Sequence, residues 1–143
     1  MLLRPNRTKF NKAQRGRLSR VVSAFPSIKH GRFALIAQES VLLTAHQIEA
    51  TRQVINRYLK RKGKIWIRAF PDLPITSKPT EVRMGKGKGA VKEWVCRLRK
   101  GKVIFEVDGV ADQRILEAFQ AARKKLPLRT LIYQTSWKFP KKV

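Results

Sequence analysis

Apolar residues recur with a strand or helix period only after the N-terminal segment of the chain. Residues 33–37 are nearly all apolar, which predicts a mostly buried strand, and residues 41–43 predict a second strand. Residues 1–28 contain two prolines, a glycine and scattered polar residues with no sustained period. We therefore expect an extended basic arm over residues 1–28, a globular domain over residues 29–135, and a basic tail over residues 136–143.

A capping box predicts a helix directly after the second strand. Thr44 and Gln47 are three residues apart, so the hydroxyl can accept a first-turn amide while the glutamine reaches back. The apolar stripe of this helix consists of Ala45, Ile48, Ile55 and Leu59. We expect the helix to run from Ala45 to about Lys62 and to end in a left-handed turn at Gly63.

The next part of the chain predicts strands that are separated by a proline-rich connection. Residues 64–70 alternate and present one apolar face. Three prolines within residues 71–79 predict an irregular connection. The segments 91–98 and 103–108 are strand-like and flank the short turn 99–102, so we expect them to pair as a β-hairpin.

A second amphipathic helix and a final strand complete the pattern. The apolar stripe of this helix is Ile115, Phe119, Ala122 and Leu126, and Pro127 follows it. Residues 129–135 have the β-branched and aromatic content of a strand. The order of elements predicts a single α+β domain, with two helices packed on an antiparallel or mixed sheet.

The large positive charge of the chain indicates what kind of molecule it binds. The 143 residues include 33 Lys and Arg against 9 Asp and Glu, which gives a formal charge of +24. Residues 1–38 alone hold nine basic side chains and no acidic one. Like charges in blocks repel one another unless a partner neutralises them, so we expect a polyanion as the partner. A hydrophobic content of 43% indicates that the chain nevertheless folds.

Several other classes of protein are excluded by the sequence. Cys96 is the single cysteine, so no internal disulfide can form. The apolar runs are far shorter than a membrane-spanning helix, and residues 1–10 lack the apolar stretch of a secretory signal. The basic arm also lacks the apolar stripe of a membrane-surface helix. We expect no membrane partner.

Two groups of residues are the candidates for nucleic-acid binding. The first group is the cations of the basic arm and of the polar side of the first helix: Arg4, Arg7, Lys9, Lys12, Arg15, Arg17, Arg20, Arg52, Arg57, Lys60 and Arg61. The second group is a glycine–lysine loop formed by Arg83, Met84, Gly85, Lys86, Gly87, Lys88 and Gly89. Its glycines let the backbone approach phosphates that its cations neutralise. The loop lacks the Gly-Lys-Ser/Thr and GxGxxG patterns of nucleotide-binding loops.

No catalytic or metal-binding set is visible. His30 and His46 have no cysteine or aspartate partner at a ligand-like spacing, and Cys96 stands alone, so we expect neither a metal nor a cofactor. Glu106 and Asp108 lie two apart on a strand and share one side of it. With so many cations available, ion pairing is the expected role of these two carboxylates.

Four aromatic side chains have two alternative roles. Tyr58, Trp66, Phe70 and Trp94 could stack on unpaired bases, but each lies in a stretch that also resembles core. We expect most of them to be buried.

Six stretches together resemble one known family. They are RPNRTKF at 4–10, LTAHQIEATRQ at 43–53, GKIWIRAFPDLPITSKP at 63–79, VRMGKGKG at 82–89, EVDGV at 106–110 and KLPLRT at 125–130. The family that they resemble is the bacterial and organellar large-subunit ribosomal protein sixteen. The resemblance covers essentially the whole chain.

The resemblance implies an α+β fold of the alpha/beta-hammerhead kind and no enzymatic activity. It also implies a structural role in the large ribosomal subunit, on its rRNA near the peptidyl-transferase region, where the protein helps to position the acceptor arm of aminoacyl-tRNA. The expected partners are large-subunit rRNA, that acceptor arm and neighbouring ribosomal proteins, with no homo-oligomer. The glycine–lysine loop is expected to point toward the catalytic centre, and Arg83 matches an arginine that is hydroxylated in some bacterial members.

Some segments depart from the family pattern. Residues 37–42 are less basic than the matching stretch of bacterial members, and residues 18–30 and 137–143 also differ. This drift suggests an organelle-encoded mitochondrial member, with plastid and bacterial origins open. The alternatives from other classes are a sequence-independent DNA- or RNA-compacting basic protein and an RNA-processing enzyme. Compaction favours apolar wedges at an exposed tip, but the expected tip here is glycine and lysine. An enzyme needs a catalytic set, and none is visible in the sequence.

Overall fold

The computed structural model describes residues 3–18 and 28–135 and shows an α+β arrangement of two helices and two antiparallel sheets. The four-stranded sheet has the order β3-β6-β1-β7, and the three-stranded sheet has the order β2-β5-β4. The elements are β1 (Phe33–Ala37), β2 (Val41–Thr44), α1 (Ala45–Tyr58), β3 (Lys64–Ile67), β4 (Leu73–Ser77), β5 (Ala90–Leu98), β6 (Val103–Asp108), α2 (Asp112–Arg123) and β7 (Thr130–Gln134). The predicted α+β class is confirmed, with two sheets in place of one.

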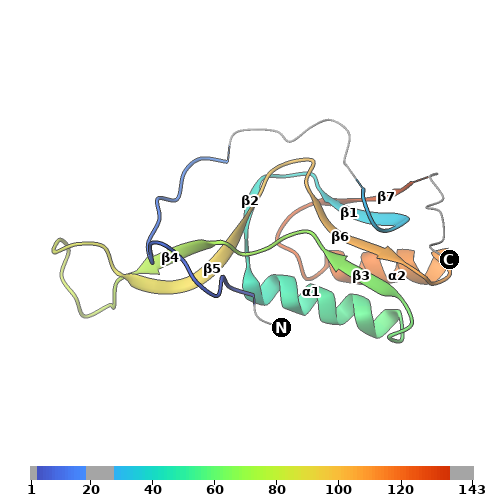
Figure 1. Ribbon diagram of the computed structural model, residues 1–143, viewed down its shortest axis with the longest axis horizontal. Helices are drawn as coiled ribbons and strands as arrows, with labels where there is room; N and C mark the ends of the chain where they lie inside the picture. The colour runs from blue at the N-terminus through green and yellow to red at the C-terminus, as the bar shows by residue number, and fades with distance from the viewer. Residues whose placement is uncertain (1–2, 19–27, 136–143) are drawn as a thin grey trace.

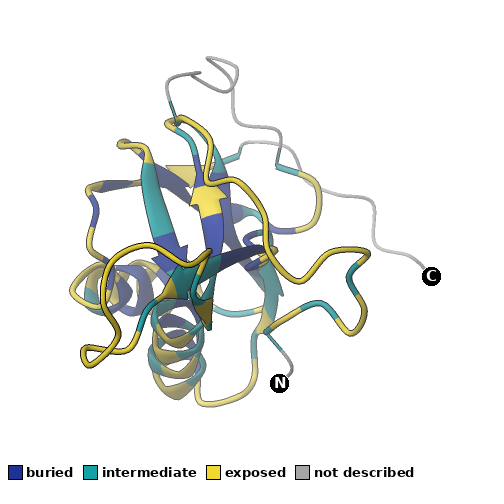
Figure 2. Cartoon of the chain, turned by 90° about the vertical axis from the view of Figure 1, so that its left-hand side faces the viewer, coloured by how far each residue is buried: buried dark blue, intermediate teal, exposed yellow. Residues whose placement is uncertain are grey.

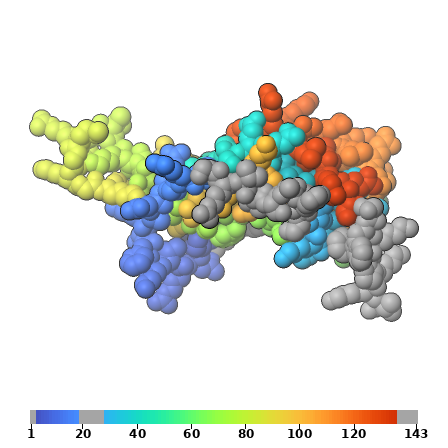
Figure 3. All heavy atoms as spheres, turned by 90° about the horizontal axis from the view of Figure 1, so that it is seen from above, coloured from blue at the N-terminus to red at the C-terminus, as the bar shows by residue number. Residues whose placement is uncertain are grey.

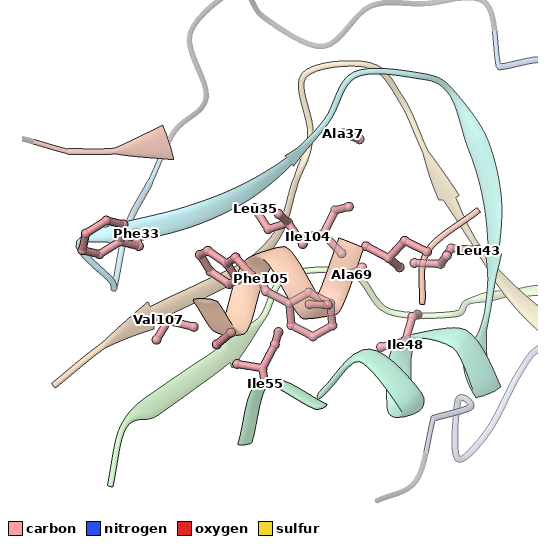
Figure 4. Packing of buried hydrophobic residues seen from close by; sticks show 14 of the residues in the cluster. Phe33, Leu35, Ala37, Leu43, Ile48, Ile55, Ala69, Ile104, Phe105 and Val107 are labelled. Atoms are coloured by element: carbon pink, nitrogen blue, oxygen red, sulfur yellow. The ribbon is translucent and has the colours of Figure 1, made fainter. Parts of the chain in front are cut away.

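The two helices lie side by side beneath the four-stranded sheet (Figure 1). Their apolar stripes face the sheet, and the buried side chains form one main core. Figure 4 shows Ile48 and Ile55 of α1 facing Leu35 and Phe105 of the sheet, and all four are fully buried. Burial of each such side chain contributes roughly 1.5–3 kcal/mol. Both predicted helical stripes are therefore correct at their buried positions.

The strands on either side of the sheet boundary form one continuous antiparallel structure. β1 pairs with β6, and β2 pairs with β5. Between these pairs, the Gly101 amide donates to the Ala37 carbonyl at 2.8 Å, and the Ala37 amide donates to the Lys102 carbonyl at 3.0 Å. We call residues 33–44 together with residues 90–108 the β-ribbon. It passes from the four-stranded sheet into the three-stranded sheet.

The predicted hairpin of β5 with β6 is wrong. β6 lies between β3 and β1, whereas β5 lies between β2 and β4, so these two strands belong to different sheets. The turn at residues 99–102 therefore leads the chain from one sheet to the other. A short turn containing glycine suits both a hairpin and such a transition, and the long-range pairing decides between them.

The predicted start of α1 is correct. The Gln47 amide donates to the Thr44 hydroxyl at 3.2 Å, and the Thr44 amide donates to the Gln47 side-chain oxygen at 3.0 Å, which completes the capping box. Its two reciprocal bonds satisfy amides that the first helical turn would otherwise leave without partners. His46 lies in this first turn, as expected from the sequence.

The predicted end of α1 at Gly63 is wrong. The helix ends at Tyr58, and the left-handed residues after it are Lys60 and Arg61, with φ of 50° and 61°. Gly63 has a different role, because a Cβ there would lie 2.9 Å from Leu59 Cδ1. The glycine is required for close packing behind the helix end and not for the turn itself.

The proline-rich connection contains a strand that the sequence reading missed. β4 includes Pro74, which lies opposite Trp94 of β5. β4 is an edge strand, and an edge position tolerates a residue without an amide proton. β4 and β5 together form a long hairpin that carries the glycine–lysine loop at its tip (Figure 1).

A buried carboxylate holds the entry to β1. Glu106 of β6 is fully buried and accepts hydrogen bonds from the backbone amides of Lys29, His30 and Gly31, the shortest being 2.6 Å from His30. The Arg68 guanidinium pairs with the same carboxylate at 2.5 Å. The predicted ion-pairing role of Glu106 is confirmed, and the pair attaches residues 29–31 to the sheet. No helix in the described part of the chain is long and apolar enough to cross a membrane.

Candidate nucleic-acid interface

The described part of the basic arm, residues 3–18, forms neither helix nor strand. Its predicted cations Arg4, Arg7, Lys9, Lys12, Arg15 and Arg17 are all exposed, whereas Arg20 lies outside the described residues. Leu3 packs against the main core at one end. Farther along, Asn11 and Lys12 line a hollow of about 620 Å³ together with Lys92 and Trp94 of β5. The arm therefore follows the three-stranded sheet with its cations exposed.

The basic arm and the glycine–lysine loop are joined by two reciprocal hydrogen bonds. The Lys12 ammonium donates to the Lys88 carbonyl at 2.7 Å, and the Lys88 ammonium donates to the Ala13 carbonyl at 2.7 Å. The two predicted binding segments are thus brought together in space, although 75 residues separate Ala13 from Lys88.

The glycine–lysine loop extends from the β4–β5 hairpin beyond the rest of the molecule (Figure 3). Residues 83–88 are all exposed, and Figure 2 shows this tip in the colour of exposed residues. Gly85 and Gly87 have φ of 91°, which glycine adopts without the strain that a side chain would introduce. Met84 is 94% exposed. An apolar side chain therefore does stand at the tip, beside the glycines and lysines that argue against an apolar wedge.

The end of α1 carries a second group of exposed cations. Arg57, Lys60 and Arg61 are exposed, and none of them forms an ion pair within the described part of the chain. With Gln53 and Asn56 they line a hollow of about 450 Å³. The left-handed backbone at Lys60 and Arg61 turns the chain back over the helix end. These three side chains are available to neutralise phosphates.

Arg52 differs from the other predicted cations of α1. Its guanidinium donates two hydrogen bonds to the Glu49 carboxylate, at 3.0 and 2.6 Å. The hydrogen bond from Arg52 lowers the pKa of Glu49 below its usual value, and the same bond raises the pKa of Arg52. Arg52 therefore carries a compensated charge and contributes less than Arg57 to attraction of a polyanion.

Arg32 is also compensated. It pairs with Asp108 at 2.7 Å and with Asp112 at 3.2 Å. The hydrogen bond to Asp108 raises the pKa of Arg32. The ion-pairing role predicted for Asp108 is therefore confirmed.

The prediction that most of the four aromatic side chains are buried is wrong. Tyr58 is 45% exposed and Phe70 is 46% exposed, while Trp66 and Trp94 are only partly buried. Trp66 stacks against His30, with 5.8 Å between ring centroids and 19° between planes. The alternation of residues 64–70 could have revealed this, because it places Trp66 and Phe70 on the side opposite the apolar face.

Among the described residues, no cluster of three or more His, Cys, Asp or Glu side chains could hold a metal ion. Cys96 is buried, and this burial raises the pKa of its thiol, so the thiol is not poised as a nucleophile. The chemistry that the described surface offers is binding by cations, amides and aromatic rings.

A small α+β core that displays unpaired cations on a helix end, an arm and a glycine-rich hairpin tip is typical of basic proteins that bind nucleic acid. Residues 5–133 match the family described as Ribosomal protein L16p/L10e. The chain belongs to this ribosomal protein family, as the resemblance indicated.

Curated relatives match this chain over most of their length. The chain is 48% identical over 133 residues to a protein of Chelativorans sp. (strain BNC1), a match that covers 93% of this chain and 97% of that protein. It is 49% identical over 133 residues to a protein of Bartonella quintana, with the same coverage. It is 49% identical over 129 residues to a protein of Rhodopseudomonas palustris, covering 90% of this chain and 94% of that protein. Each relative is named large ribosomal subunit protein uL16.

These relatives are bacterial. They give no support to the mitochondrial assignment suggested by the divergent segments, and they agree with the bacterial origin that was left open.

Proposed function

We propose that this ribosomal protein is a structural constituent of the large subunit that binds large-subunit rRNA near the peptidyl-transferase region and helps to position the acceptor arm of aminoacyl-tRNA. The relatives are large-subunit proteins, which supports the assignment to the large subunit. Its partners in this proposal are rRNA, the tRNA acceptor arm and neighbouring ribosomal proteins. Catalysis is not part of the proposal.

The main evidence for rRNA binding is the distribution of unpaired cations. Among the described carboxylates, Glu49, Glu106, Asp108 and Asp112 are paired with Arg52, Arg68 and Arg32. The cations of the basic arm, the α1 end and the glycine–lysine loop have no such partner within the described residues. A surface with many uncompensated cations favours a polyanion as partner, and folded RNA supplies closely spaced phosphates.

A salt titration tests the RNA-binding part. Neutralising several phosphates releases counterions, so affinity for an rRNA fragment should fall by orders of magnitude between low and moderate salt. Replacing both Lys60 and Arg61 with Ala should lower affinity and reduce the slope of log affinity against log salt by about 1 to 2. A flat salt profile for the native chain contradicts phosphate binding.

Gradient fractionation tests the assignment to the large subunit. The tagged chain should sediment with the large subunit of the organism that encodes it. Sedimentation with the small subunit, or as free protein at normal expression, contradicts the proposal. The same preparation from isolated organelles and from cytosol tests the compartment, which stays a prediction.

The role in tRNA positioning rests on the projecting loop. The arm and the α1 end supply most of the cations, so replacing Lys86 and Lys88 with Ala should leave the protein on the subunit but slow dipeptide formation. Gly87→Val should act in the same way, because valine is strained at a φ of 91°. Normal rates at full occupancy would show that the loop has no part in tRNA positioning.

A further inference from the structure

A concave surface at β3, the edge strand of the four-stranded sheet, is not accounted for by phosphate binding. The hollow has a volume of about 510 Å³, within the range of pockets that hold small ligands. It lies between α1, β3 and the segment before β1, and its lining includes His30, Arg52, Asn56, Trp66 and Arg68. It therefore combines aromatic rings, an amide and two guanidinium groups.

The two rings of this hollow are only partly covered by one another. A centroid distance of 5.8 Å with planes 19° apart describes an offset stack, in which part of each ring face stays free. His30 is exposed, and Trp66 is partly buried. The His30 backbone is fixed, because its amide donates to the buried Glu106 carboxylate at 2.6 Å. The pair is thus a pre-positioned platform for a third flat ring.

The charges in this hollow are compensated. Arg52 is held by Glu49, and Arg68 is held by the fully buried Glu106. A free phosphate gains little at such pairs, since each guanidinium already has an anion. A neutral planar group avoids this competition, and the guanidinium nitrogens not used for pairing can still donate hydrogen bonds to its oxygens and nitrogens.

The neighbouring hollow supplies the missing positive charge. Asn56 lines both hollows, and the second one is formed by the unpaired cations Arg57, Lys60 and Arg61. A neutral aromatic site thus lies beside a cationic site, with an amide that can donate and accept between them. This order matches the parts of one nucleotide, a base joined to a phosphate.

We infer that these two hollows bind a single unpaired nucleotide of RNA, with its base on the His30–Trp66 platform and its phosphate at Arg57, Lys60 and Arg61. Asn56 lies where it can contact the edge of the base. This inference rests on the proposed binding of RNA, and it adds that one base is read outside a duplex. Stacking of bases on aromatic side chains is the common mode of recognising unpaired RNA.

The experiment uses the full chain and two RNA hairpins that differ by one bulged nucleotide. The bulge is 2-aminopurine, whose fluorescence reports stacking, and the partner hairpin is fully paired. The native chain should bind the bulged hairpin about tenfold more tightly, which is within the range of one base–aromatic stack, and should quench its fluorescence. Equal affinity for the two hairpins would overturn the inference.

Variants separate the platform from general RNA binding. Trp66→Leu keeps an apolar but smaller side chain that cannot stack, so it should abolish the preference for the bulge while the salt dependence stays. Tyr133→Leu, at a partly exposed aromatic side chain on β7, is the matched control and should retain the preference. His30→Ala removes an exposed side chain, which keeps the test valid if Trp66→Leu does not fold. A preference that survives both Trp66→Leu and His30→Ala contradicts the inference. If the native chain shows no salt-dependent binding to either hairpin, the proposed function is contradicted instead.

Discussion

Replacing Glu106 with glutamine tests whether the buried carboxylate attaches the entry of β1 to the sheet. Oε2 accepts the amides of His30 and Gly31, Oε1 accepts from Arg68, and the Lys29 amide lies 3.3 Å from both oxygens. Glutamine has nearly the same shape, but one of its two terminal groups is a donor. In either orientation this donor meets the backbone amides or the guanidinium. Removing one side of a buried ion pair typically costs about 3–5 kcal/mol, a large part of the stability of a small domain.

The assay is urea unfolding, followed by far-ultraviolet circular dichroism. Glu49→Gln is the matched control, since it makes the same chemical change at a carboxylate whose side chain is 25% exposed and paired with Arg52. That substitution should cost about 1 kcal/mol or less. In native-state hydrogen exchange, the amides of His30 and Gly31 should be protected in the native chain and exchange faster in Glu106→Gln. Equal free energies of unfolding for the two variants would refute the reasoning.

Three further predictions concern the core, one ion pair and the hairpin base. Ile55→Asp puts a carboxylate in a fully buried position and should cost on the order of 3 kcal/mol or more, measured by the melting temperature, while Arg57→Ala at an exposed position should leave it unchanged. The folded-state pKa of Glu49 is lowered, so its stabilising effect should be present at neutral pH. The native chain and Glu49→Gln should then differ in free energy of unfolding above pH 4.5, the usual pKa of the group, and this difference should disappear as the pH falls through the lowered pKa of the folded state. A difference that persists in acid contradicts this prediction. Gly89→Ala would place a Cβ well inside contact distance of the Ser77 carbonyl oxygen, so it should loosen the β4–β5 pairing and speed amide exchange there. Unchanged exchange rates would count against that close contact.

Local signals predicted the elements whose causes are local. The capping box of Thr44 and Gln47 is a signal of four residues that fixes the start of α1. The buried positions Ile48 and Ile55 follow from helical spacing alone. The end of α1 was less predictable, because Lys60 and Arg61 adopt positive φ at a position where glycine is the usual signal.

Pairing between distant strands was not accessible from the sequence pattern. The turn 99–102 favoured a hairpin, but β5 and β6 each pair with strands from other parts of the chain. Pro74 is unfavourable in a central strand because it has no amide proton, but β4 is an edge strand, where proline is tolerated. Both errors arise because the pattern reports which segments are extended and not which segments are neighbours.

The charge pattern of the sequence predicted the exposed cations of the candidate site, but not the arrangement of its aromatic side chains. The exposure of Arg57, Lys60 and the glycine–lysine loop follows the polar pattern. That Arg52 is compensated by Glu49 could be inferred from their spacing of three on a helix. The platform of His30 and Trp66 could not, because it joins residues from separate segments.

The β-ribbon also constrains how the chain can fold. Thr44 pairs with Val95 and Phe33 with Val107, so its rungs join residues more than 50 positions apart. Contacts of such high sequence separation slow folding, since a long loop must close before any rung forms. β6, the strand that pairs with both β1 and β3, ends at Asp108, about three quarters of the way along the chain. During synthesis, therefore, the helix α1 is made well before the surface that buries its apolar stripe, and a highly cationic nascent chain stays open to anionic partners throughout that interval.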